Sequence, residues 1–87
     1  MELTQEQRKS FKMQAHSLKP VVSIGGKGLT DAVIAELEIA LKAHELIKVK
    51  IAADRDERKV IYAKIVSDLN AIGIQLIGQM GVFYKQN

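Results

Sequence analysis

A glycine-rich segment early in the chain has the composition of a phosphate-binding loop. Gly25, Gly26 and Gly28 surround Lys27, and a short apolar run precedes them. Glycines let backbone amides approach an anion closely, and a helix that begins after them directs its positive end to the same place. The spacing is neither a dinucleotide fingerprint nor a P-loop. The alternative interpretation is an ordinary tight turn, which we expect for the second GxxG segment at 78–81.

A second group of residues precedes this loop and is basic. Four of its members have helical spacing, at i, i+4, i+8 and i+11: Arg8, Lys12, His16 and Lys19. Lys9 lies beside this stripe. Such a stripe either contacts the phosphates of a polyanion or is a solvated helix face. The stripe alone leaves both interpretations open. Together with the glycine loop it favours nucleic-acid binding, with Lys27, Lys12 and Arg8 on phosphates and the loop amides around one of them.

The sequence offers little that supports catalysis. It has no cysteine, and its two histidines do not have the spacing of a zinc site. His44 continues an apolar helical stripe, so we expect it to be buried. Three acidic residues crowd together at Asp54, Asp56 and Glu57, where acids at a helix N-terminus are the simpler explanation than a cation site. We therefore expect no enzyme, no metal, no cofactor and no small-molecule substrate.

Length and charge set the broad class of the protein. Eighty-seven residues make one domain, at 1–87, and 47% apolar with 26% charged residues is typical of a globular chain. The net charge of +3 is uneven: five basic residues oppose two acidic ones in 1–28, one opposes four in 29–47, and seven oppose four in 48–87. This pattern indicates either one face for a polyanion or three amphipathic segments.

No apolar run is long enough for a membrane span, and the N-terminus has no signal-peptide pattern. We therefore expect a cytoplasmic protein with no membrane partner, and a monomer is favoured.

Hydrophobic periodicity predicts three helices and four strands. The first helix begins after Thr4, with Gln7 completing a capping box, and ends before Pro20. Thr30 or Asp31 caps the second, and Asp54 caps the third. The third helix is expected to continue through Ile72 to a left-handed Gly73. The predicted strands cover 21–24, 46–52, 74–77 and 82–85, the last two as a hairpin.

The order α-β-α-β-α-β-β predicts an α/β two-layer sandwich, with three helices on one face of a four-stranded mixed sheet. Alternation in 46–52 places Ile47, Val49 and Ile51 toward the helices and Lys48 and Lys50 toward water. Lys48 and Lys50, with Lys85, are second-tier candidates for nucleic-acid contact on this open sheet face. Arg55 and Arg58 are weaker candidates still. Only four aromatic residues are present, which disfavours base stacking on an aromatic platform.

Three blocks of the sequence closely resemble the CRM domain, and more narrowly the bacterial stand-alone YhbY family. They are Leu-Lys-Pro-Val-Val at 18–22, Ile-Gly-Gly-Lys-Gly-Leu-Thr at 24–30 and His-Glu-Leu-Ile-Lys-Val-Lys-Ile at 44–51. The likeness spans essentially the whole chain, including Gln-Leu-Ile-Gly at 75–78 and Phe-Tyr at 83–84.

The resemblance implies an RNA-binding domain whose fold is similar to the C-terminal domain of translation initiation factor 3. It implies a GxxG loop at Gly25–Gly28, used much as KH domains use theirs, and a basic first helix with Arg8, Lys9, Lys12 and His16. It also implies an assembly factor that associates with precursors of the large ribosomal subunit through ribosomal RNA. The alternative from a different class is a protein-binding adaptor, which would use the open sheet face or the acidic second helix.

Overall fold

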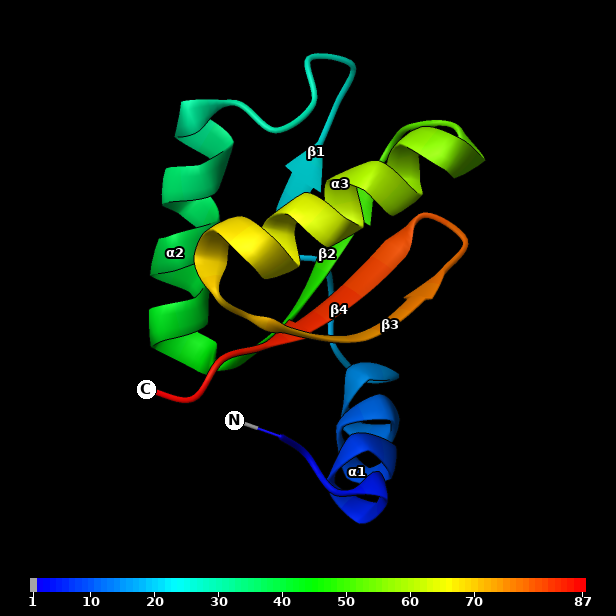
Figure 1. Ribbon diagram of the computed structural model, residues 1–87, viewed down its shortest axis with the longest axis vertical. Helices are drawn as coiled ribbons and strands as arrows, with labels where there is room; N and C mark the ends of the chain where they lie inside the picture. The colour runs from blue at the N-terminus through cyan, green and yellow to red at the C-terminus, as the bar shows by residue number, and fades with distance from the viewer. Residues whose placement is uncertain (1) are drawn as a thin grey trace.

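The computed structural model describes residues 2–87 and contains three helices and four strands in the predicted order (Figure 1). The bounds of the elements are α1 Gln5–Ala15, β1 Val22–Ile24, α2 Asp31–His44, β2 Leu46–Ile51, α3 Arg55–Leu69, β3 Ile72–Ile77 and β4 Met80–Tyr84. All seven predicted elements are present, although α3 is shorter than predicted and β3 begins earlier, at Ile72.

The strands form one mixed sheet in the order β1-β2-β4-β3. β1 is parallel to β2, with Val22 beside Val49 and Ile24 beside Ile51. β4 is antiparallel to both of its neighbours, β2 and β3. The β3–β4 hairpin therefore inserts its second strand next to β2 and leaves β3 on the edge of the sheet.

Side-chain caps start the helices where the sequence predicts. The Thr4 hydroxyl accepts a hydrogen bond from the amide of Gln7 at 3.1 Å, and the Gln7 side chain accepts one from the Thr4 amide at 2.9 Å. Thr30 caps α2 through the Val33 amide at 3.2 Å. Asp54 caps α3 through the Glu57 amide at 2.9 Å. Each cap satisfies an amide that the first helical turn leaves without a partner.

The prediction for the end of α3 was wrong. The helix ends at Leu69, and the left-handed residue is Asn70, with φ 53° and ψ 42°. Gly73 lies inside β3 instead, and a Cβ atom there would overlap the Tyr62 ring. Gly73 thus serves the close approach of a side chain to the backbone, which helical periodicity does not reveal.

The main hydrophobic core lies on the side of the sheet that packs against α2 and α3, here called the covered face. Ile47, Val49 and Ile51 of β2 meet Leu37 of α2 and Ile65 of α3 there, and all five are at most 1% exposed. These positions alternate along β2 and recur with helical spacing along α2 and α3, as a strand and two amphipathic helices require.

The opposite side of the sheet, here called the open face, carries α1. Ala15 of α1 joins Leu46, Ile74 and Val82 in a second, smaller cluster. The prediction of three helices on one face was therefore wrong in this detail: two helices cover one face and the third covers part of the other. Phe11, Ala15 and Leu18 recur at i, i+4 and i+7 in the sequence, which indicates that α1 has an apolar side. This spacing cannot show which surface of the sheet that side meets.

Candidate nucleic-acid interface

α1 is attached to one end of the open face by an aromatic contact. The rings of Phe11 and Tyr84 stack with centroids 4.3 Å apart and planes inclined by 26°. Leu18, just after the helix, joins the same cluster. Tyr84 lies beside Leu46 at the start of β2 and beside Ile72 at the start of β3. α1 therefore covers the end of the sheet at which β2 begins.

The remainder of the open face carries the two lysines of β2. Lys48 is half-buried next to the region covered by α1, and Lys50 is exposed one step further along the strand. Ser23 of β1 and Met80 of β4 flank Lys50 in the register, and Met80 is paired in turn with Ile77, which is 62% exposed. The predicted orientation of both lysines away from α2 and α3 is confirmed.

The Gly25–Gly28 segment is a tight turn that extends beyond the end of β1. The Gly28 amide donates to the Gly25 carbonyl at 3.0 Å, and Gly28 has a φ of 70°. Lys27 lies at the tip and is exposed. Leu29 and Thr30 separate this turn from the first residue of α2. The turn thus presents a lysine and small residues to solvent, while Thr30 already caps the helix that follows.

The basic residues of the first segment do not form one continuous helical stripe. α1 ends at Ala15 and His16 is its C-cap, so Lys19 lies beyond the helix. Arg8 is half-buried, and its guanidinium donates to the Gly73 carbonyl of β3 at 3.2 Å. The exposed basic residues of α1 and its cap are Lys9, Lys12 and His16.

Arg8 also affects Tyr62, which packs over Gly73 from α3. Burial raises the pKa of the Tyr62 phenol above its ordinary value, and the positive charge of Arg8 opposes that rise. The guanidinium of Arg8 therefore has a structural contact that links α1 to the edge strand.

α1 and the glycine turn lie at opposite ends of the molecule, at the bottom and the top of Figure 1. α1 packs where β2 begins at Leu46, whereas the turn follows Ile24, which is paired with Ile51 at the other end of β2. Leu46 and Ile51 are five residue steps apart along the extended strand, which corresponds to about 16 Å. Lys48 and Lys50 lie on the open face between them. The structure thus places these lysines along the path that connects the two predicted phosphate-binding regions.

Sequence reasoning missed one residue of this region. His44 is exposed, and the prediction that it is buried was wrong. It is the last residue of α2, and only Leu37, Ala40 and Leu41 of that helix are buried. A helical wheel gives the direction of a side chain but not whether a neighbouring element packs against it.

The aromatic side chains do not form a stacking platform. Phe11 stacks on Tyr84, and Tyr62 packs against Phe83 with ring centroids 5.0 Å apart. All four aromatic residues of the chain are therefore used in packing between elements. Contact with a nucleic-acid backbone fits this surface better than stacking on aromatic rings.

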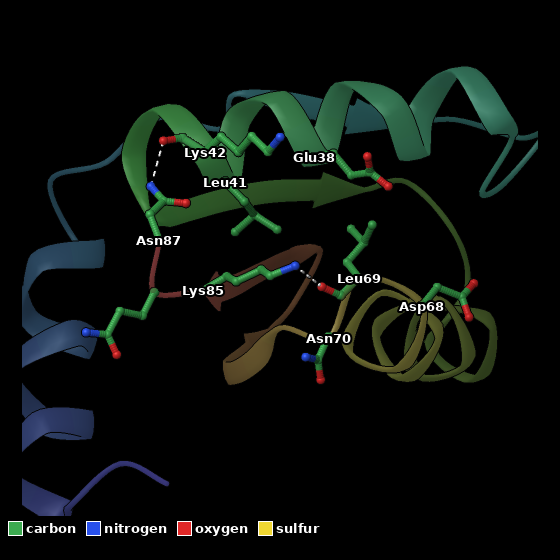
Figure 2. A pocket seen from close by; sticks show the side chains of 9 residues that line it. Glu38, Leu41, Lys42, Asp68, Leu69, Asn70, Lys85 and Asn87 are labelled. Atoms are coloured by element: carbon green, nitrogen blue, oxygen red, sulfur yellow. Dashed lines mark hydrogen bonds between the residues drawn. The ribbon is translucent and has the colours of Figure 1, made fainter. Parts of the chain in front are cut away.

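A hollow of about 410 Å³ lies elsewhere, between α2, α3 and the last residues of the chain (Figure 2). Side chains of both charge signs line it, and Glu38 and Asp68 are the acidic ones. The Lys85 ammonium donates to the Leu69 carbonyl at 2.8 Å, where α3 ends. Lys85 therefore caps a helix and is not on the open face, which corrects the expectation that grouped it with Lys48 and Lys50.

Neither of the Arg55 and Arg58 side chains is on the open face. Both border a small hollow beside α3, and Arg58 donates to the Ala53 carbonyl at 2.7 Å. Within residues 2–87, the structure contains no group of three or more side chains that could hold a metal ion. Among the helices of this same range, none is long and apolar enough to cross a membrane.

Comparison with known proteins connects the chain to a family. The family model of the CRS1/YhbY (CRM) domain matches residues 3–85. A Pseudomonas aeruginosa protein named a probable RNA-binding protein is 48% identical, over 100% of this chain and 85% of the relative. A Haemophilus influenzae protein named an RNA-binding protein is 48% identical, over 95% of this chain and 85% of the relative. The Bacillus subtilis probable RNA-binding protein YqeI is 34% identical, over 98% and 90%.

A solved structure has the same fold. The solution structure of a hypothetical Staphylococcus aureus protein, described as a candidate RNA-binding protein, superimposes with a TM-score of 0.85. The two sequences are 28% identical, and the match covers 99% of this chain and 91% of the other. The arrangement of α1 and the hairpin is thus part of a fold that an experimental structure also shows.

Proposed function

Because the chain belongs to the CRS1/YhbY (CRM) domain family, whose model matches residues 3–85, we propose that it is a non-catalytic RNA-binding protein. Three of its relatives are named as RNA-binding proteins or probable ones. The proposal assigns RNA to the open face, with its phosphates on α1, on the two lysines of β2 and on the glycine turn.

The observation that carries this proposal is the position of Lys48 and Lys50. They lie on the open face between α1, which carries Lys12, and the turn that carries Lys27. The acidic residues of α2 belong to the other side of the sheet, since α2 packs on the covered face. This separation of charge favours the first of the two interpretations of the uneven sequence: one face for a polyanion.

The contacts of the open face are to the RNA backbone, since the aromatic rings are occupied in packing. About four phosphate contacts predict a slope of about −3 to −4 when log affinity is plotted against log salt concentration. Structured or single-stranded RNA that spans the open face satisfies this geometry. The contacts are electrostatic, so affinity falls steeply with added salt.

Charge reversal tests the assignment. We expect Lys27→Glu and Lys50→Glu each to weaken binding to RNA in a filter-binding or fluorescence-anisotropy titration, without changing the melting temperature. Lys64→Glu, on the exposed side of α3, is the matched control and keeps the parent affinity. Equal weakening by all three variants would indicate only an effect of net charge and would contradict a defined surface.

We further propose that the RNA is ribosomal and that the protein acts in the cytoplasm as an assembly factor on precursors of the large subunit. The family resemblance of the sequence supports this role. In a sucrose gradient of cell lysate, the protein is expected to migrate with large-subunit precursors. The Lys12→Glu/Lys27→Glu double variant is expected to remain at the top of the gradient. A parent protein that also remains at the top, at low and moderate salt, would argue against the ribosomal role.

A specific feature keeps the protein-binding adaptor as a second candidate. Ile39 is 69% exposed on α2, and the exposed acidic residues Glu36 and Glu38 accompany it. An apolar residue with acidic neighbours suits a basic protein surface. Ribosome association that survives the loss of the basic α1 and loop charges would favour this candidate over RNA binding.

A further inference from the structure

A groove of about 380 Å³ lies where the open face meets the segment that joins α1 to β1. Its apolar lining includes Leu18, Val21 and Leu46. Val21, the residue before the first residue of β1, is 47% exposed. The volume is in the lower part of the range of about 300–1,000 Å³ that is typical of small-ligand sites. It is sufficient for one flat ring system with an attached sugar.

The groove exists because β1 is shorter than β2. β1 pairs with β2 only from Val49 to Ile51, with one further bond from the Val21 amide to the Lys48 carbonyl at 2.9 Å. Leu46 and Ile47 therefore lie on a part of β2 that has no pairing with β1. Pro20, the residue before Val21, has no amide hydrogen and therefore cannot extend the pairing with β2.

Three basic side chains and one amide surround this apolar floor. Lys19, His44 and Lys48 line the groove, each from a different element or loop. The Gln14 amide nitrogen donates to the Ser10 hydroxyl at 3.1 Å, which leaves the Gln14 carbonyl oxygen as an acceptor. An apolar floor with a cationic rim is complementary to a nucleotide, whose base is flat and weakly polar and whose phosphate is anionic.

We propose that this groove holds one unstacked base of the bound RNA, with the adjoining phosphates on Lys19 and Lys48. The proposal rests on RNA binding by the open face and adds to it a site at which the protein contacts a base. In this site the base lies against Leu18 and Val21. The imidazole of His44 supplies the ring on which a base stacks, and the Gln14 amide contacts the base edge.

In this proposal, a surface whose aromatic rings are all used in packing still offers one site for a base. His44 is the one ring-bearing side chain of the groove, and it is exposed where the helical pattern predicts burial. A base in the groove also requires the RNA to be single-stranded at that point, because a paired base cannot leave its partner without a cost in free energy.

The test compares two single strands of equal length and phosphate number: a mixed-sequence oligoribonucleotide containing all four bases, and an abasic ribose–phosphate strand. Affinities are measured by fluorescence anisotropy, and the methyl resonances of Leu18, Val21 and Leu46 are followed by NMR. We expect the strand with bases to bind at least about fivefold more tightly, as one stacked base contributes. The groove methyl resonances are expected to shift only with that strand.

Variants complete the test. His44→Ala and Val21→Ser are expected to remove the preference for the strand with bases while leaving affinity for the abasic strand unchanged. Val60→Ser is the matched control, since Val60 is 57% exposed on α3, away from the groove. Equal affinity for the two strands, or unshifted groove methyls, would overturn the base site and leave RNA binding by the open face intact. Failure of the parent protein to bind either strand would overturn both.

Discussion

The two faces of the sheet differ in what covers them and in what remains exposed. The covered face is closed by α2 and α3 over Phe83 and the β2 residues Ile47, Val49 and Ile51. The open face is closed only at one end, by α1, and carries lysines where the other face carries isoleucine and valine. Alternate residues of one strand, β2, thus point to opposite faces. The larger hydrophobic core lies on the covered face, and the proposed RNA contacts lie on the open face.

The substitution with the largest expected effect creates a cavity in the core of the covered face. Phe83 is fully buried and packs against Tyr62, so Phe83→Ala is expected to lower the free energy of unfolding by about 3–5 kcal/mol. Urea denaturation followed by circular dichroism measures the change. Val60→Ala, at an exposed position of α3, is the control and is expected to stay within about 0.5 kcal/mol. A loss below about 1 kcal/mol for Phe83→Ala would show that the two faces share stability more evenly.

The corresponding test on the open face is Lys48→Glu/Lys50→Glu. Removing two phosphate contacts is expected to make the slope of log affinity against log salt shallower by about 1.4 for a single strand. The unfolding transition is expected to change little, because Lys50 is exposed and Lys48 half-buried. Anisotropy titrations at several salt concentrations measure the slope. A slope identical to that of the parent would remove the β2 lysines from the interface.

This contrast between the faces also explains which parts of the fold the sequence predicts. Strand β2 alternates between apolar and charged residues from Ile47 to Ile51, so its two faces are evident there. Helix caps such as Thr4 and Asp54 are local, since they depend on residues three apart. The side of the sheet on which α1 packs depends on the stacking of Phe11 with Tyr84, at the opposite end of the chain. No local pattern contains that information.

The candidate site divides in the same way. Lys27 and Lys50 are exposed as predicted, because a turn tip and the polar side of a strand are local properties. Arg8 and Lys85 look like free charges in the sequence, yet each donates to a backbone carbonyl of a distant segment. His44 is the reverse case, a residue with a buried pattern that is exposed at the last position of α2.

Arg8 sharpens the comparison because it lies on α1 but acts as a structural residue. Arg8→Ala removes a half-buried hydrogen bond to the Gly73 carbonyl and is expected to cost about 1 kcal/mol of stability. Loss of its positive charge is also expected to raise the pKa of Tyr62 further, which ultraviolet titration of the phenolate measures. Lys12→Ala is the control: it is expected to weaken RNA binding and leave the pKa of Tyr62 unchanged.

The same raised pKa gives the direction of the alkaline stability profile. The folded state favours the neutral phenol of Tyr62, so the folded protein retains a proton that the unfolded chain loses above about pH 10, the ordinary value. The free energy of unfolding is therefore expected to fall as the pH rises above 10. The fall is expected to be steeper in Arg8→Ala, and a smaller fall in that variant would contradict a nearby guanidinium.

The smallest expected changes in stability separate the two roles of the glycine turn. Gly28 has a φ of 70°, so Gly28→Ala is expected to cost about 1 kcal/mol. That cost lowers the melting temperature by about 4–8 °C in a domain of this size. Gly26 does not have a positive φ, and a Cβ there would meet nothing within 4 Å. Gly26→Ala is therefore expected to be neutral or to stabilise by up to about 1 kcal/mol.

RNA affinity then reports on the close approach of a phosphate to the backbone. If the turn amides hold a phosphate, a methyl group at Gly26 weakens binding while the melting temperature stays level or rises. Gly78→Ala is the matched control from the other GxxG segment, since Gly78 also has a positive φ, of 56°, but joins β3 to β4. That variant is expected to lose stability and retain RNA affinity below its melting transition. Unchanged affinity in Gly26→Ala would reduce the role of the turn to the charge of Lys27 alone.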